Sequence, residues 1–394
     1  MLKKSPYSNY LNHFIWLRFF CIFCIFLLHT GLTFSYIPEL IPFWYFKSEW
    51  VSIIITGFCA FANSACMPLF FFLSGIGAFQ RISSGDMSYF NRRTKKWLKI
   101  IIYNWPVIAA SILTTSFFLD KQPIFLLKIA FPSSNSYSTS NLLPFNFFHL
   151  WYLFVLLLIE GLMIFTYPFI RKNFKPIYLL SLPFFQMGII LIQNQGYMMV
   201  PLTIDVYSLG SIFIYWGWFI AGWIFSSLDV SKLYINPKKI RFFFSVNIIG
   251  FFISKFTLLF IDNDHLTLLN QFCISFFDSL LPWAVLSIWF DLINQDSFHA
   301  LTLKFQIFER FLNKVIKYAL DIYILQIPVI FGILSILVNF KEPVIFFKTI
   351  DESKLNESQF ALFYWMLLTF STAIIISVII HFKNRIKFPL LNWH

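Results

Sequence analysis

Long apolar stretches separated by short polar connections run along the whole chain. In a helix that rises 1.5 Å per residue, about 20 apolar residues cross the hydrocarbon core of a bilayer. Such stretches predict helices at residues 14–34, 50–79, 97–118, 147–170, 176–193, 206–227, 241–261, 267–290, 316–338 and 359–381. The pattern therefore predicts an all-α, polytopic membrane protein with about ten transmembrane helices in one bundle.

The second of these stretches is longer than one straight span needs. Residues 50–79 contain the sequence "NSACMP", which places Pro68 inside the predicted helix. Proline has no backbone N–H, and its ring clashes with the carbonyl four residues earlier. We therefore expect a kink or a break in the helix near Pro68.

The composition agrees with a membrane protein. Of 394 residues, 58% are hydrophobic and only 12% are charged, whereas soluble domains carry about 25% charged residues. Neither end of the chain changes in composition and no internal repeat is apparent, so we expect one integral-membrane domain over residues 1–394. Lys3 and Lys4 precede an apolar run as in a signal peptide, but Arg18 interrupts that run. We expect the first helix to remain in the mature protein.

The net charge of +12 could suggest a nucleic-acid partner, but the distribution of the charges favours a different role. Basic residues gather at both termini and after the second, fourth, sixth and eighth predicted helices, and the other connections are nearly neutral or acidic. This alternation follows the positive-inside rule and predicts that both termini are cytoplasmic. Most of these bases are expected to orient the protein and to contact anionic lipid, and no nucleic acid is expected.

The cysteines add little chemistry. All five lie in apolar stretches, and one pair has C-x-x-C spacing: Cys21, Cys24, Cys59, Cys66 and Cys273. In a lipid-embedded helix, a small apolar side chain of this kind serves packing. We expect neither a disulfide nor a metal site.

Two ionisable residues interrupt the first predicted helix. Arg18 and His29 are eleven residues apart in "RFFCIFCIFLLHT", which is three helical turns plus about 20°, so both side chains project from one face, about 16 Å apart along the axis. Ionisable groups within a membrane helix usually face a cavity, a partner or a ligand. The alternative is an arginine that snorkels to the cytoplasmic interface and a histidine at the external one.

A second pair with the same spacing occurs in the fourth predicted helix. His149 and Glu160 are also eleven residues apart, and this helix runs in the opposite direction, so His149 lies at the external level and Glu160 deeper. If the first and fourth helices are neighbours, His29 could approach His149, and Glu160 could pair with Arg18 or with another buried base. The alternative for His149 is an interfacial residue beside Trp151 in an aromatic belt.

Several motifs together resemble the membrane-bound acyltransferase family 3. That family has an arginine, ten residues and a histidine in its first helix, as Arg18 and His29 stand here, and a "PLFFFLSG" stretch like residues 67–79. A basic cytoplasmic loop follows that stretch, and a segment like "HLWYL" at residues 149–153 begins the fourth helix. Ten spans with both ends inside are typical of such domains. The resemblance covers essentially the whole chain.

The sequence departs from this family pattern at two places. The loop after the second helix often has two arginines separated by two residues, whereas "NRRTKKW" pairs an arginine with a lysine. Lysine keeps the charge but loses bidentate recognition of phosphate. The late segment "IYILQIP" has Gln326 where the family often has histidine. Glutamine can form hydrogen bonds but cannot act as a base.

The resemblance implies transfer of an acyl group, often acetyl, from cytoplasmic acyl-CoA to a hydroxyl of a surface or exported carbohydrate, in a bacterial plasma membrane. Such a transfer needs a base at the acceptor hydroxyl and cationic groups for the phosphates of the donor. His29 is placed to be the base, Arg18 faces the donor side, and Glu160 could orient a base. The bases expected at the cytoplasmic mouth are Arg92, Arg93, Lys95 and Lys96.

Other interpretations of the same sequence remain open. A transporter or exporter of a glycan or lipid-linked intermediate would share the bundle and its intramembrane charges. A sensor or assembly subunit would need no chemistry at all. Ser74 and Gly75 are expected to bend or pack the second helix, since small residues permit close helix approach.

Overall fold

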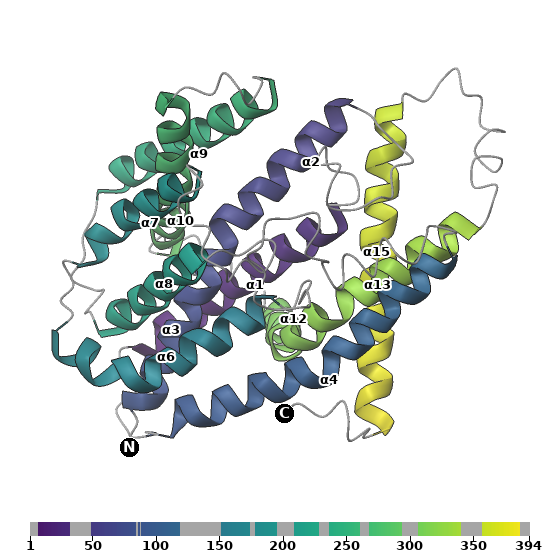
Figure 1. Ribbon diagram of the computed structural model, residues 1–394, viewed down its shortest axis with the longest axis horizontal. Helices are drawn as coiled ribbons and strands as arrows, with labels where there is room; N and C mark the ends of the chain where they lie inside the picture. Colours follow the sequence, from purple (N-terminus) through teal and green to yellow (C-terminus); the bar gives the residue numbers. More distant parts are fainter. Residues whose placement is uncertain are drawn as a thin grey trace, which may run out of the picture.

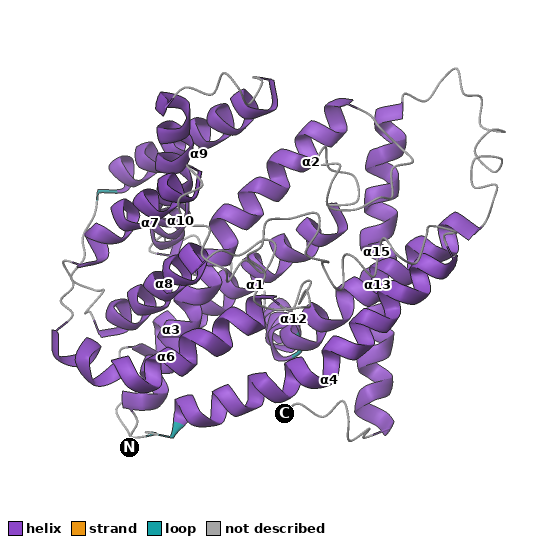
Figure 2. Cartoon of the chain, viewed as in Figure 1, coloured by secondary structure: helices purple, strands orange, loops and turns teal. Residues whose placement is uncertain are grey.

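The computed structural model describes residues 7–31, 49–83, 86, 88–118, 151–173, 178–194, 209–227, 236–260, 268–293, 306–339 and 357–386. In these ranges the regular structure is helical and contains no strand (Figure 2). The helices are α1 (Tyr7–Gly31), α2 (Glu49–Phe61), η2 (Ala62–Cys66), α3 (Met67–Ser83), α4 (Tyr89–Phe118), α6 (Trp151–Asn173), α7 (Tyr178–Asn194), α8 (Leu209–Ser227), α9 (Pro237–Phe260), α10 (Leu268–Ile293), α12 (Gln306–Lys317), α13 (Ala319–Asn339) and α15 (Glu357–Ile386).

The prediction of an all-α polytopic membrane protein is confirmed. A helix occupies each of the ten predicted stretches. Within the described residues, five helical segments are long and apolar enough to cross a membrane: Phe14–Gly31, Ile53–Ser83, Tyr152–Ile170, Phe272–Leu292 and Trp365–Phe382. Very large exposed fractions of apolar side chains, 81% for Phe165 and 72% for Phe242, suit contact with lipid tails.

One helix was not predicted. α12 lies in the basic connection that follows the eighth predicted span and packs against α1 and α13. Its Leu312 is fully buried, whereas Lys314 and Lys317 are exposed. A helix that is apolar on one face only has a low average hydropathy, so a search for apolar stretches overlooks it.

The long second span bears out the irregularity expected near Pro68. α2 and α3 follow one another through η2, a π-helical turn over Ala62–Cys66 that ends two residues before this proline. Because Pro68 cannot donate a hydrogen bond to the carbonyl of Ser64, the wider turn accommodates the missing bond. The helix therefore changes register locally and does not break.

The helices form two groups on either side of a central layer (Figure 1). α7, α8, α9 and α10 pack together on one side, and α4, α13 and α15 on the other. α1, η2 and α3 lie between the groups: η2 contacts α10, α1 contacts α13 and α15, and α3 contacts both α8 and α4. α6 packs against α4 and α8. This arrangement brings polar residues of α1, α3, α4, α6 and α13 toward one interior region.

Close backbone contact between α3 and α8 depends on two glycines. A Cβ atom added at Gly75 would overlap the backbone carbonyl of Phe219, and one added at Gly222 would overlap that of Phe72. Each glycine thus lies against the backbone of the other helix, so neither position has room for a methyl group. The packing role predicted for Gly75 is confirmed.

Aromatic side chains fill the core beside this contact. Phe71 stacks on Tyr215 with ring centroids 4.5 Å apart. Trp218 packs against Trp283 at 4.9 Å and donates its indole N–H to the side-chain oxygen of Gln186 at 2.8 Å. All five cysteines are free thiols, and four of them are buried.

Candidate functional site

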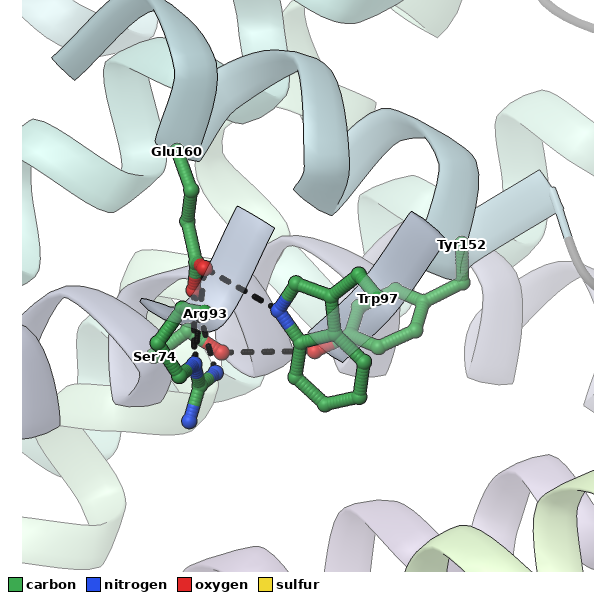
Figure 3. Close-up of polar contacts among 5 residues, drawn as sticks. All are labelled: Ser74, Arg93, Trp97, Tyr152 and Glu160. Atoms are coloured by element: carbon green, nitrogen blue, oxygen red, sulfur yellow. Dashed lines mark hydrogen bonds and ion pairs between the residues drawn. The ribbon is translucent and has the colours of Figure 1, made fainter. Parts of the chain in front are cut away.

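A carboxylate with no solvent exposure lies on α6. The Glu160 side chain is 0% exposed, and its Oε1 lies 3.0 Å from Nη2 of Arg93. Nε of Arg93 donates to Oε1 at 3.2 Å, and Nε1 of Trp97 donates to Oε2 at 3.0 Å (Figure 3). A buried carboxylate is tolerated only with such compensation, because removal of the charge from water costs several kcal/mol.

The spacing of residues on α4 explains how Arg93 is held. Tyr89, Arg93 and Trp97 are four residues apart in succession, so they share one face of the helix. Cζ of Arg93 lies 4.6 Å from the ring centroid of Trp97 and 5.4 Å from that of Tyr89. Both contacts have the geometry of cation–π interactions, which favour a fixed guanidinium. Local sequence therefore aims this arginine at α6.

The four bases predicted at the cytoplasmic mouth are not equivalent. Arg92 has a 61% exposed side chain and pairs with Asp86 in the connection before α4. The hydrogen bond that Arg92 donates to the Asp86 carboxylate lowers the pKa of Asp86 below its ordinary value. Lys95 is exposed, and Lys96 is exposed on the same face as Arg93. Only Arg93 of these four contacts Glu160 among the described residues.

Arg18 belongs to the same region but has different neighbours from those expected. It is partly buried on α1 and lies within electrostatic range of Arg93, Tyr152 and Tyr89. The expected partner of Glu160 was either Arg18 or another buried base. In the structure the partner is Arg93. In the described part of the chain, Arg18 has no ion-pair partner. The region therefore holds two guanidiniums, and only one of them has a carboxylate partner among the described residues.

The assumed contact between the first and fourth predicted helices is not a main packing contact. α1 packs chiefly against η2, α2, α3, α12, α13 and α15, and α6 packs against α4 and α8. α6 packs closely against α4, which is why Glu160 meets a base from α4. Arg18 still approaches this region because arginine has a long side chain.

Ser74 and Tyr152 connect α3 to α6. The hydroxyl oxygens of the two residues lie 3.3 Å apart, within hydrogen-bond distance (Figure 3). The Tyr152 ring in turn packs edge-on against Tyr323 of α13, with centroids 5.9 Å apart. Ser74 therefore bridges two helices through its hydroxyl in addition to the predicted packing role of this stretch.

His29 lies in the last turn of α1 and is only 6% exposed. Its ring centroid is 6.3 Å from that of Tyr323 on α13. The next residue, Thr30, accepts hydrogen bonds from Nε1 of Trp365 at 3.2 Å and from the hydroxyl of Thr369 at 3.0 Å. The end of α1 is therefore fixed against α13 and α15.

The predicted approach of His149 to His29 cannot be placed, because His149 lies outside the described residues. It stays a prediction. The residues that sequence reasoning missed are aromatic: Trp97, Tyr152 and Tyr323. In a chain with 22% aromatic residues, these three carry no distinguishing signal of their own. The four-residue spacing of Tyr89, Arg93 and Trp97 could have identified the first of them.

These polar groups extend along one interior region. Arg93, Glu160 and Arg18 lie at one end, and His29 with Gln326 lies at the other, about 16 Å away along α1. Tyr152 and Tyr323 connect the two ends by ring contacts. The arrangement combines a surplus cation with a buried imidazole, which is a set of groups suited to an anionic substrate and to proton transfer.

Comparison with known proteins identifies the family. Residues 11–382 match the model of an acyltransferase domain, Acyl_transf_3. Comparisons with curated proteins and with solved structures give no match. Since the family match spans nearly the whole chain, this protein belongs to the membrane-bound acyltransferase family 3.

Proposed function

We propose that this protein transfers an acyl group, with acetyl as the first choice, from cytoplasmic acyl-CoA to a hydroxyl of a cell-surface or exported carbohydrate. We further propose a bacterial plasma membrane and cytoplasmic termini. The observation that carries the proposal is the continuous interior region that joins Arg18 and Arg93 to His29. The family supports acyl transfer in general, and this geometry supports the division into a donor end and an acceptor end.

The donor end is the part of the site with surplus positive charge. Arg93 is compensated by Glu160 and fixed by Trp97, while Arg18 has no carboxylate partner among the described residues. An uncompensated guanidinium in a partly buried site is stabilised by an anion. Acyl-CoA supplies phosphates, and its thioester oxygen becomes negative during attack, so either group suits this position.

The acceptor end is the environment of His29. A neutral imidazole can take the proton of a carbohydrate hydroxyl as its oxygen attacks the thioester carbonyl carbon. A C–O bond forms, the C–S bond breaks, and the coenzyme A thiolate leaves. The thiolate then takes up a proton, and the net products are an ester and a free thiol.

Turnover of acetyl-CoA by purified protein tests this proposal. The protein is reconstituted in liposomes, and release of coenzyme A is followed with acetyl-CoA alone and with added envelope carbohydrate. We expect repeated turnover by the wild type, stimulated by carbohydrate, and loss on the order of 100-fold or more in H29A, which is the usual contribution of a general base.

The matched control is H381A. His381 is an exposed histidine of α15, outside the interior region. It should keep wild-type turnover if the loss in H29A reflects the site and not the removal of a histidine. Turnover by H29A equal to that of H381A would exclude His29 as the base, and absence of any turnover by the wild type would contradict acyl transfer from acetyl-CoA.

A further inference from the structure

We propose that Gln326 is a positioning residue for His29, whose imidazole it holds in one tautomer and one orientation. This inference rests on the proposed role of His29 as the base. The side chain of Gln326 is 1% exposed and that of His29 is 6% exposed, and the two belong to helices that pack against each other, α13 and α1. Buried polar side chains pair with one another, and an imidazole and an amide offer complementary hydrogen-bonding groups.

The face of α13 that carries Gln326 supports the imidazole at a second point. Tyr323 precedes Gln326 by three residues, so both side chains project from the same side of the helix. The Tyr323 ring lies 6.3 Å from that of His29, centroid to centroid. Tyr323 therefore contacts the ring, and Gln326 stands on the same side of α13 to bond to it, which restricts both rotation and tilt.

The backbone on which His29 is mounted is restrained as well. Thr30 receives hydrogen bonds from Trp365 and Thr369 of α15, and α15 packs against α13. α13 and α15 thus close around the end of α1. A base held in this way keeps its reactive nitrogen aimed at the acceptor position, and a displacement of about 1 Å can cost on the order of 100-fold in rate.

The chemistry of an amide explains why glutamine suits this position. A neutral imidazole has one N–H and one free electron pair, and the hydrogen bond made by the first nitrogen decides which tautomer is present. The amide oxygen of glutamine can accept that N–H, which leaves the other nitrogen free to take a proton. An amide does not titrate, so it orients the base without competing for the proton.

The test that does not depend on activity is the tautomer of His29. Protein labelled with ¹⁵N-histidine is examined by solid-state NMR in liposomes, and the His29 signals are identified as those absent from H29A. We expect one neutral tautomer in the wild type and a mixture in Q326M, which keeps the length of the side chain but removes the amide. An unchanged tautomer in Q326M would overturn the inference.

The matched control is Q186M. Gln186 is another buried glutamine, and it bonds to Trp218 on the opposite side of the bundle. Its loss removes a buried hydrogen bond of the same kind but should leave the His29 signals as in the wild type. A change in His29 signals equal to that of Q326M would mean that both variants act by loosening the bundle. Q326A, measured on the folded fraction, is the second variant should Q326M aggregate.

Kinetics separate positioning from substrate binding. We expect Q326M to lower kcat for acetyl-CoA turnover about 10- to 100-fold and to leave KM for acetyl-CoA within about twofold, because the donor end is unchanged. A rise in KM with unchanged kcat would contradict the inference. If the wild type shows no turnover, the proposed function fails, whereas the NMR comparison still decides whether Gln326 sets the tautomer.

Discussion

Nη2 of Arg93 lies 3.0 Å from Oε1 of Glu160, across the contact between α4 and α6. The same guanidinium stacks on Trp97, which also donates to this carboxylate. The three side chains therefore form a closed unit in which each group satisfies another. The neighbouring residue, Arg92, turns outward to Asp86. Two adjacent positions of α4 therefore hold one surface residue and one site residue.

This difference predicts unequal effects of the same conservative change. R93K should lower acetyl-CoA turnover at least 10-fold, because an ammonium group cannot both donate two hydrogen bonds in one plane and stack on Trp97. R92K should remain within about twofold of the wild type, because its partner Asp86 is at the surface. Turnover and apparent KM of the two purified variants check this. Equal effects would mean that only the total charge of the loop counts.

Arg18 offers a second test of guanidinium chemistry. R18K should lose most of its turnover if the arginine makes a forked contact with phosphate or with the thioester oxygen. R241K is the matched control, because Arg241 pairs with Asp291 on the other side of the bundle. Comparable loss in the two variants, or none in R18K, would remove Arg18 from the donor end.

The close approach of α3 and α8 predicts a pair of opposite outcomes for glycine. G75A should lower the thermal unfolding midpoint strongly, since the new Cβ would overlap the Phe219 carbonyl. G77A has open space around the added Cβ and should be neutral or slightly stabilising, because alanine favours a helix over glycine by up to about 1 kcal/mol. Thermal denaturation in detergent measures both. Similar midpoints would mean that α8 moves to accept the methyl group.

The ion pair between α9 and α10 predicts that removing one of its two charges destabilises the protein more than removing both. Nζ of Lys255 lies 2.7 Å from Oδ2 of Asp278, and both side chains are largely buried. D278L alone leaves an ammonium without its partner, so it should lower the unfolding midpoint more than K255M/D278L does. The expected difference corresponds to a few kcal/mol. A double variant as unstable as the single one would show that the pair itself stabilises the contact.

Membrane orientation can be tested with engineered cysteines. A cysteine at Ser83, exposed at the end of α3, should react only with thiol reagents on the cytoplasmic side, and one at Ser136 only with external reagents. Background is low because four native cysteines are buried, and Cys273 can be replaced by serine. External labelling at Ser83 would invert the bundle and separate the donor end from cytoplasmic acyl-CoA.

The sequence alone determined the class of fold and the residues that needed explanation. Apolar stretches long enough for a bilayer fix the helices, because a backbone in lipid must satisfy its own hydrogen bonds. The eleven-residue spacing of Arg18 and His29 fixes their common face, because helical geometry is local. A glutamate within a span predicts a base nearby, because an unpaired charge is costly to bury. In the structure that base is Arg93.

The choice of that base was a matter of tertiary structure. Arg92 and Arg93 are adjacent and chemically identical, and only the packing of α4 on α6 turns one of them to Glu160. In the same way, Tyr323 is nearly 300 residues from His29 in sequence, and the two rings lie 6.3 Å apart because α13 packs against α1. Hydropathy fixes which segments enter the membrane, but lipid solvates every apolar face alike. Helix neighbours are therefore decided by side-chain shape and by the pairing of buried polar groups, which become defined only when the bundle is complete.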